Sequence, residues 1–432
     1  MTTVSIIGTG MAGCGAIHKA TELGVGTITY DMHTHVGGHT ASFQFDSGFT
    51  IDEGPHVSFT KIERIQDILA ECVKGEYFEH KTKVNNHWKG HWIKHPAQIN
   101  LHGLPPDLIA KCIEDFVAAS HAPEPKINNY EDWLLGAFGE TFARTFPMEY
   151  TKKYHTTSAD NMSTDWVGPR LYRPELKEVL GGALNPKSDD VHYIGGFRYP
   201  KRGGFAAYVQ PFMEKTDLRL GHKMVGIDPK QKTIEFANGK VEPYEHLVSS
   251  VPLPELIPAI KDTPPDVLDA AARLTCSEVV IVSVGIDRAD IIDAHWTYFY
   301  DEDYFFTRLS TPHLQSKLNV PEGCGSIQAE CYYSKKYRPL DRTPDACIEP
   351  VIADLRRCGL IKDTDKIMFT HAMYIPYANV IFDLERKASV KTVHGYLKDV
   401  GIQYCGRYGD WAYIWTDQSF VSGEHAVQRA IG

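Results

Sequence analysis

A glycine-rich turn near the start of the chain constrains the fold more than any other feature. The strand-like run TVSII precedes Gly8, Gly10 and Gly13, which have the spacing G-x-G-x-x-G, and the helical pattern MAGCGAIHKATELG follows. A second strand-like run ends at Asp31, which is placed to accept a hydrogen bond from a ribose hydroxyl. Strand, glycine turn, helix and acid in this order predict an α/β chain with a Rossmann-type dinucleotide-binding domain.

Each residue of the turn has a physical role in this interpretation. Gly8 allows the tight turn, Gly10 lets the backbone approach a pyrophosphate, and Gly13 lets helix and strand pack closely. Met11 and Ala12 begin the helix, whose free N–H groups attract an anion. The alternative is a glycine-rich turn that binds no ligand.

The residues after Asp31 favour FAD over NAD as the dinucleotide. Gly37 and Gly38 follow the acid in MHTHVGGHT and allow a second close approach of the backbone. This pattern resembles the FAD-binding pattern of the glutathione-reductase-like flavoproteins, in particular the branch of amine oxidases, protoporphyrinogen oxidases and UDP-galactopyranose mutases. GFTIDEGPHVSFT resembles the next segment of that branch, in which His56 matches a histidine near the flavin.

The same resemblance implies further cofactor residues. GRYGDWAYIWTDQSFVSGEHAV resembles the closing segment of the branch, which runs past the flavin. The additional residues assigned to FAD are His39, Val225, Gly406, Trp411, Asp417, Gln418 and Ser419.

Two groups of histidines resemble metal sites but lack a ligand set. His33, His35 and His39 lie on the loop expected to wrap the dinucleotide, without a cysteine or carboxylate set beside them. The histidines of HWKGHWIKHP flank a Lys-Gly pair, which indicates a hairpin turn. No metal is expected.

Length, charge and cysteine usage narrow the protein class. The chain has 432 residues, which suits two or three packed domains, and a net charge of −10, which argues against nucleic acid as a partner. Its 9 cysteines form no close C-x-x-C pair and indicate reduced thiols in the cytoplasm. We see neither a signal peptide nor a membrane span in the sequence. A homo-oligomer stays open.

The order of helical and strand patterns predicts a discontinuous cofactor domain with a helical insertion and a mixed β-sheet domain. A mostly helical stretch interrupts two groups of strand patterns, and the cofactor domain resumes after it. The expected segments are 1–77, 190–270 and 370–432 for the cofactor domain, 105–189 for the helical insertion, and 78–104 with 271–369 for an antiparallel substrate sheet.

The helical insertion carries the stretch that narrows the function most. In YTKKYHTTSADNMSTDWVGPRL, the residues Tyr150, Trp166, Gly168 and Arg170 match the spacing of UDP-galactopyranose mutases. By this resemblance Arg170 contacts the substrate diphosphate, and Arg308 in DYFFTRLST is the second diphosphate arginine. Guanidinium groups suit this role because they make bidentate contacts to phosphate. Alternatively, both arginines have local structural roles.

Two more residues are assigned to the substrate by the same resemblance. His155 stands where the family has an aromatic residue near the uracil, which puts uridine specificity in question. Arg198 belongs to GGFRYPKRGGFAAY, which resembles the next signature of the family.

The choice among the late tyrosines stays open. Tyr332 and Tyr333 are candidates for a phosphate contact, with an ordinary strand as the alternative. The late Tyr-Pro motif of the family is altered to MYIPYANVIFD, so that Tyr377, Tyr374 or Asn379 takes the place of its tyrosine.

The resemblance implies an FAD-dependent mutase that interconverts pyranose and furanose forms of a nucleotide-diphosphate sugar. N5 of the reduced flavin would be the nucleophile, Arg170 and Arg308 would hold the diphosphate, and His56, Tyr150 and Tyr377 complete the catalytic candidates. The alternative is an FAD-dependent oxidoreductase of the amine oxidase or protoporphyrinogen oxidase type. A non-catalytic flavin-binding protein is a third possibility.

Overall fold

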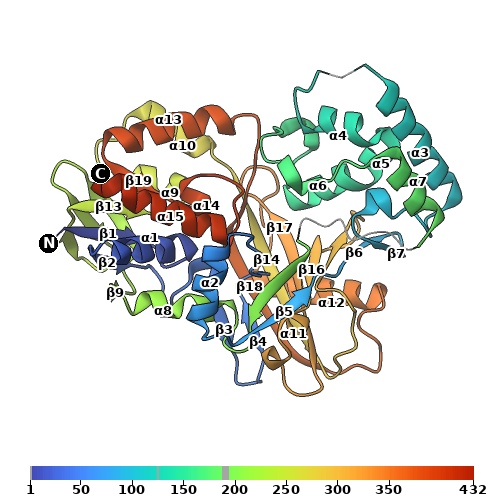
Figure 1. The fold of residues 1–432 in the computed structure, drawn as a ribbon, viewed down its shortest axis with the longest axis horizontal. Coiled ribbons are helices and arrows are strands. Elements are labelled where there is room, and N and C mark those ends of the chain that lie inside the picture. Colours follow the sequence, from blue (N-terminus) through green and yellow to red (C-terminus); the bar gives the residue numbers. More distant parts are fainter. Residues whose placement is uncertain (1, 124–125, 187–193) are drawn as a thin grey trace.

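A computed structural model describes residues 2–123, 126–186 and 194–432 of the chain (Figure 1). Figure 1 shows a sheet with helices around both termini, a larger sheet at the centre, and a separate group of helices on one side. The expected α/β fold class with a Rossmann-type domain, helices and a mixed sheet is confirmed. The expected domain boundary at 189–190 lies outside the described residues.

The sheet near the termini has five strands, and all of its pairs are parallel. β1 is almost completely buried, as expected for a parallel strand with helices on both faces. In sheet order the strands are β19 (Ile402–Tyr404), β13 (His246–Ser249), β1 (Thr3–Ile7), β2 (Gly26–Tyr30) and β9 (Asp217–Arg219). The helices of this part are α1 (Met11–Glu22), α2 (Glu63–Cys72), α8 (Gln210–Met213), α9 (Leu253–Ala259), α10 (Pro265–Arg273), α13 (Arg386–Asp399), α14 (Gly406–Gly409) and α15 (Thr416–Ile431).

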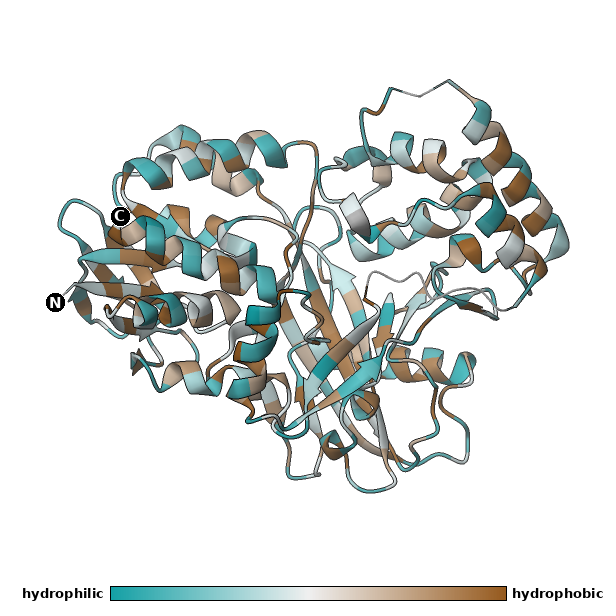
Figure 2. Ribbon diagram, viewed as in Figure 1, coloured by the Kyte–Doolittle hydropathy of each residue, from teal (hydrophilic) through white to brown (hydrophobic). Residues whose placement is uncertain are grey.

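The central sheet has seven strands and is mixed. Hydrophobic residues run along its strands, whereas hydrophobic and hydrophilic residues alternate on the outer helices (Figure 2). In sheet order the strands are β18 (Ile367–Val380), β14 (Cys276–Ile286), β17 (Gly325–Tyr333), β16 (Arg308–Ser310), β15 (Trp296–Phe299), β6 (Val84–Trp88) and β7 (His91–Lys94). Two helices, α11 (Pro312–Gln315) and α12 (Ile348–Arg357), accompany it.

The central sheet differs from the sequence-based expectation in two respects. The pair of β6 and β15 is parallel, although an antiparallel sheet was expected. Because the helical insertion separates these strands in the chain, no hairpin imposes an antiparallel pairing. The expected boundary at residue 370 falls inside β18, which pairs with β14. The hairpin expected in HWKGHWIKHP is confirmed by the antiparallel pair of β6 and β7.

The helical group on the side packs around a core of its own aromatic residues. Phe138, Phe142 and Phe146 are buried and contact one another in series. Its elements are α3 (Pro106–His121), α4 (Tyr130–Phe138), α5 (Glu140–Ala143), a π-helical turn (Arg144–Met148), α6 (Glu149–Tyr154) and α7 (Leu176–Leu184). The smaller sheets pair β3 (Ser42–Gln44) with β4 (Thr50–Asp52), β5 (Tyr77–Lys81) with β8 (Gly196–Pro200), and β10 (Met224–Asp228) with β11 (Thr233–Phe236) and β12 (Val241–Pro243). None of the described helices combines the length and the apolar composition that a membrane crossing requires.

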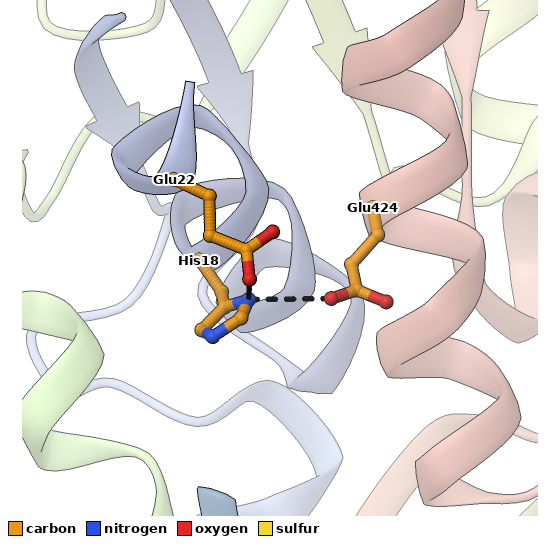
Figure 3. A group of neighbouring side chains, drawn as sticks. All are labelled: His18, Glu22 and Glu424. Carbon is orange, nitrogen blue, oxygen red and sulfur yellow. Dashed lines mark hydrogen bonds and ion pairs between the residues drawn. The ribbon is translucent and has the colours of Figure 1, made fainter. Parts of the chain in front are cut away.

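A charged cluster joins three helices around the five-stranded sheet. Figure 3 shows His18 and Glu22 of α1 facing Glu424 of α15, with His18 Nδ1 3.2 Å from Glu424 Oε1. Arg64 of α2 donates to both oxygens of Glu424 at 2.6 Å. The guanidinium therefore supplies a positive charge beside these carboxylates, which a metal ion would otherwise supply. We interpret the cluster as a structural link rather than a metal site.

Glu424→Gln should destabilise the fold by about 2 kcal/mol at pH 7, since a neutral amide replaces the carboxylate that binds both Nη atoms of Arg64. Burial raises the pKa of Glu424, but Arg64 outweighs burial and the pKa falls to about 2. An unfolded glutamate has a pKa of ~4.3, so this stabilisation is complete above that pH and disappears as the pH falls toward the folded value. Urea unfolding at pH 7 and at lower pH measures the effect. A difference between wild type and variant that stays constant down to the acid range would contradict it.

Candidate functional site

A cavity of about 660 Å³ lies between the five-stranded and the seven-stranded sheet. Gly8, Asp31, Ser250 and Gly406 line it, and they follow the carboxyl ends of β1, β2, β13 and β19. Residues of β14, β16, β17 and β18 form the opposite wall. The carboxyl edge of a parallel sheet is where such folds bind ligands.

The first glycine turn is shaped by packing at two positions and by the cavity at a third. A Cβ on Gly8, where φ is +109°, would lie 2.1 Å from Ser250 Oγ, and one on Gly13 would lie 2.1 Å from the Gly8 oxygen. A Cβ on Gly10 would meet only the Gly37 oxygen at 3.5 Å. The fold therefore tolerates a side chain at position 10, and the space above it belongs to the cavity.

Asp31 is fixed by the same turn. Its Oδ2 accepts hydrogen bonds from the Thr9 amide at 2.9 Å and the Thr9 hydroxyl at 2.6 Å, and its Oδ1 accepts from the His33 amide at 2.9 Å. The hydroxyl of Thr9 also accepts from the Gly37 amide at 3.1 Å, which ties the second glycine loop to the first. A carboxylate has lone pairs beyond these three bonds, so Asp31 can still accept from a ribose.

The residues present fit the pyrophosphate of a dinucleotide. Met11 and Ala12 line the cavity in the first turn of α1, where backbone N–H groups have no intrahelical partner. Gly37 and Gly38 have φ values of +112° and +50° and bring a second stretch of bare backbone to the same place. His39 lines the wall beside them, and its Nδ1 is hydrogen-bonded to Glu53 Oε1 at 2.7 Å.

The opposite wall holds a paired arginine. Arg308 lines the cavity, and its Nε and Nη2 both donate to Glu330, the second at 2.8 Å. Burial lowers the pKa of Arg308, but Glu330 outweighs burial and keeps the pKa well above its usual value. The guanidinium therefore stays charged, with Nη1 outside the pair.

A second arginine on the cavity, the half-buried Arg407, belongs to the closing motif but was not among the residues predicted from the sequence. Its guanidinium donates to the Ile414 oxygen at 2.7 and 3.0 Å, to the Ala378 oxygen at 3.2 Å and to Asn379 Oδ1 at 3.1 Å. These partners are neutral oxygens, so they leave the positive charge of Arg407 uncompensated. The adjacent Gly406, which follows β19 and was predicted to contact the cofactor, was the signal in the sequence that could have indicated Arg407.

Arg170 lies behind the wall of the cavity. Its guanidinium is 4.6 Å from the ring of Tyr413 and 4.4 Å from the ring of Trp415, and both rings line the cavity. It also donates to the backbone oxygens of Trp166 and Tyr413. The structure therefore brings Arg170 and Arg308 to the same end of the cavity, with aromatic rings between Arg170 and the open space.

Tyr154 and Tyr413 join the helical group to the C-terminal segment, and sequence reasoning missed both. Their hydroxyl oxygens are 2.8 Å apart, although the residues are far apart in the chain. The π-helical turn directly before α6 changes the direction in which that helix presents Tyr150 and Tyr154. Tyr154 lines the cavity, whereas Tyr150 packs behind it.

His155, expected near the base, lies behind Tyr154 together with the substrate candidate Trp166 and the catalytic candidate Tyr150. Tyr150, His155 and Trp166 do not line the cavity, and the buried atoms Tyr150 Oη, His155 Nδ1 and Trp166 Nε1 have no hydrogen-bond partner among the described residues. Burial lowers the pKa of His155 to about 3, so this ring is neutral.

The structure shows which of the late tyrosine candidates face the cavity. Tyr332 lines the cavity, whereas the hydroxyl of Tyr333 lies 4.0 Å from Cys347 Sγ on the other face of β17. Successive side chains of a strand point to opposite faces, so one of the two had to point away. Tyr374, Tyr377 and Asn379 all line the cavity.

His56 also lines the cavity, and its protonation state follows from its surroundings. Its Nδ1 donates to the Gly54 oxygen at 3.1 Å. Burial, followed by the charge of Arg407, lowers its pKa to about 3. His56 is therefore neutral, with Nε2 as an acceptor.

Several predicted residues are not brought to the cavity. Arg198 of β8 pairs with Glu79, its cross-strand neighbour on β5, at 2.8 Å. Val225 is 49% exposed, whereas its neighbours from His222 to Met224 line the cavity. Trp411 is fully buried behind the wall, and of the residues at the start of α15 Ser419 lines the cavity while Asp417 and Gln418 do not.

Comparisons with known proteins show which proteins share this architecture. Residues 6–72 match the family model of the NAD(P)-binding Rossmann-like domain. A crystal structure of reduced UDP-galactopyranose mutase is 28% identical with a TM-score of 0.94, and the match covers 100% of this chain and 96% of that chain.

Two further structures share the fold alone. A protein from Exiguobacterium sp. 255-15 assigned as a protoporphyrinogen oxidase is 14% identical with a TM-score of 0.77, over 99% of this chain and 98% of that chain. A redesigned putrescine oxidase is 15% identical with a TM-score of 0.68, over 100% and 99%. These matches and the glycine-lined cavity support a dinucleotide cofactor. The chain is thus similar over its full length to UDP-galactopyranose mutase and fits the flavoprotein superfamily, as its motifs indicated.

Proposed function

We propose that the protein is an FAD-dependent mutase that interconverts the pyranose and furanose forms of a nucleotide-diphosphate sugar. The observation that carries this proposal is one cavity with a dinucleotide cradle at one end and Arg308, Arg407 and tyrosine hydroxyls at the other. Cations and hydroxyl donors in this arrangement suit a diphosphate that leaves a sugar. The full-length likeness to UDP-galactopyranose mutase supports the same reaction class.

FAD is the dinucleotide that we propose. The second glycine pair, Gly37 and Gly38, extends the bare backbone beyond the first turn, and the cavity continues from Asp31 to the central sheet. Bound there, the reduced flavin supplies a nucleophilic nitrogen. No step then requires a nucleophilic side chain of the protein.

The residues around the reacting end would bind and orient the substrate. Arg308 and Arg407 are charged and half-buried, and would hold phosphate oxygens as negative charge develops on them. Burial raises the pKa of Tyr154 and Tyr332 well above the usual value, so both phenols stay protonated and can donate. Ile281 and the other aliphatic residues of the wall exclude water.

Turnover should require the reduced flavin and consume no net reductant, because ring interconversion leaves the oxidation state of the sugar unchanged. The test is an anaerobic assay of nucleotide sugars, beginning with UDP-galactose, on dithionite-reduced protein, with oxidised protein as control. A strict need for oxygen or another acceptor, with stoichiometric oxidation of a substrate, would select an oxidoreductase instead. The fold shared with the two oxidases makes that the second candidate.

A further inference from the structure

We propose that His222 recognises the 6-amino group of adenine in the bound dinucleotide and makes the site selective for adenine over 6-oxopurines. This inference rests on the proposed FAD site and concerns the end of the cavity away from the reaction. His222, Lys223 and Met224 line that end.

The sheet order places His222 where the base must lie. The glycine turn follows β1, Asp31 follows β2, and His222 lies beyond β9, so the three follow one another across the sheet. The backbone amide of His222 donates to the backbone oxygen of Asp31 at 2.7 Å, and that of Gly221 donates to the backbone oxygen of His33 at 2.9 Å. In a dinucleotide the base lies beyond the ribose, on the side away from the pyrophosphate. His222 is therefore one strand further along that path than Asp31.

The hydrogen bonds of the imidazole define what it can offer to a ligand. Nδ1 of His222 lies 2.8 Å from the Leu220 oxygen, and since a carbonyl only accepts, Nδ1 carries the hydrogen. In the neutral ring Nε2 is then a bare acceptor. The residue is 8% exposed, and Nε2 is buried with no hydrogen-bond partner among the described residues. A buried acceptor without a partner is unfavourable, so a donor on the ligand would complete the site.

The ring is also held in place. Its centroid is 5.8 Å from that of Tyr30 and 5.2 Å from that of Phe236, which it meets edge to face. Lys223, the next residue, offers only donors from its side chain. Of these two side chains, only that of His222 can therefore accept a hydrogen bond from an exocyclic amine. The carbonyl oxygen of hypoxanthine would instead place one acceptor against another.

A competition experiment on the full-length holoprotein tests this. Protein is equilibrated with mixtures of FAD and its hypoxanthine analogue, and the bound ratio is read by mass spectrometry after removal of free cofactor. Wild type should prefer FAD by about 10-fold or more. In His222→Phe, which keeps an aromatic ring between Tyr30 and Phe236, the preference should fall to near one.

A second variant and a control separate recognition from packing. His222→Gln, whose amide can turn either N–H or oxygen toward the base, should also lose most of the preference. Phe236→Leu loosens the packing around the ring but leaves Nε2 of His222 unchanged, so this variant should keep the preference for FAD. Equal binding of both cofactors by wild type, or an unchanged preference in the His222 variants, would overturn the inference while leaving the FAD site intact. Failure of wild type to bind either cofactor would instead remove the proposed function and the inference with it.

Discussion

Arg308→Lys should lower turnover by the reduced protein by about 100-fold or more, equivalent to roughly 3 kcal/mol of transition-state stabilisation. Glu330 accepts from Nε and Nη2 of Arg308, and Nη1 takes no part in that pair. A guanidinium can thus bind Glu330 and a phosphate together. A lysine ammonium is a single point charge and cannot reproduce this fork, although it keeps the charge.

The measurement is steady-state kinetics with reduced flavin, with FAD content and unfolding recorded for each variant. Arg170→Lys should also be impaired, because its guanidinium lies against the rings of Tyr413 and Trp415, which line the same end of the cavity. Arg198→Lys is a matched control, since Arg198 pairs with Glu79 away from the cavity. A near-wild-type rate in Arg308→Lys would contradict the proposal that its guanidinium holds the diphosphate of the substrate.

Gly10→Val should abolish FAD binding while the protein stays folded. The fold itself leaves room at this position, where a Cβ would meet only the Gly37 oxygen at 3.5 Å. A branched side chain would instead fill the space in which the pyrophosphate approaches the backbone. Flavin absorbance of the purified variant and titration with added FAD measure the loss, and circular dichroism checks the fold.

Gly395→Val provides the control for this variant. Gly395 lies in α13, and a Cβ there would meet nothing within 4 Å. This variant should remain yellow, with at most a small loss of stability from a β-branched residue in a helix. A Gly10→Val protein with full flavin content, or a colourless wild type that takes up no added FAD, would contradict the assignment of the cradle.

The sequence by itself was sufficient to predict the α/β fold class and the glycine turn that lines the cavity. Gly8, Gly10, Gly13 and Asp31 lie within one strand–helix–strand unit, and their roles depend on local backbone geometry. Such short-range constraints can be read from spacing alone. The motif residues Arg170 and Arg308 were also predicted to act at one place, and the structure brings both to the same end of the cavity.

Only the tertiary structure decided which of the remaining residues face the cavity. Strand register turned Tyr332 inward and Tyr333 outward, and cross-strand pairing held Arg198 against Glu79. The bond between Tyr154 and Tyr413 joins elements that no local pattern relates. Composition and spacing specify which groups are available, but long-range packing decides where each side chain points, because one step of register along a strand reverses its face.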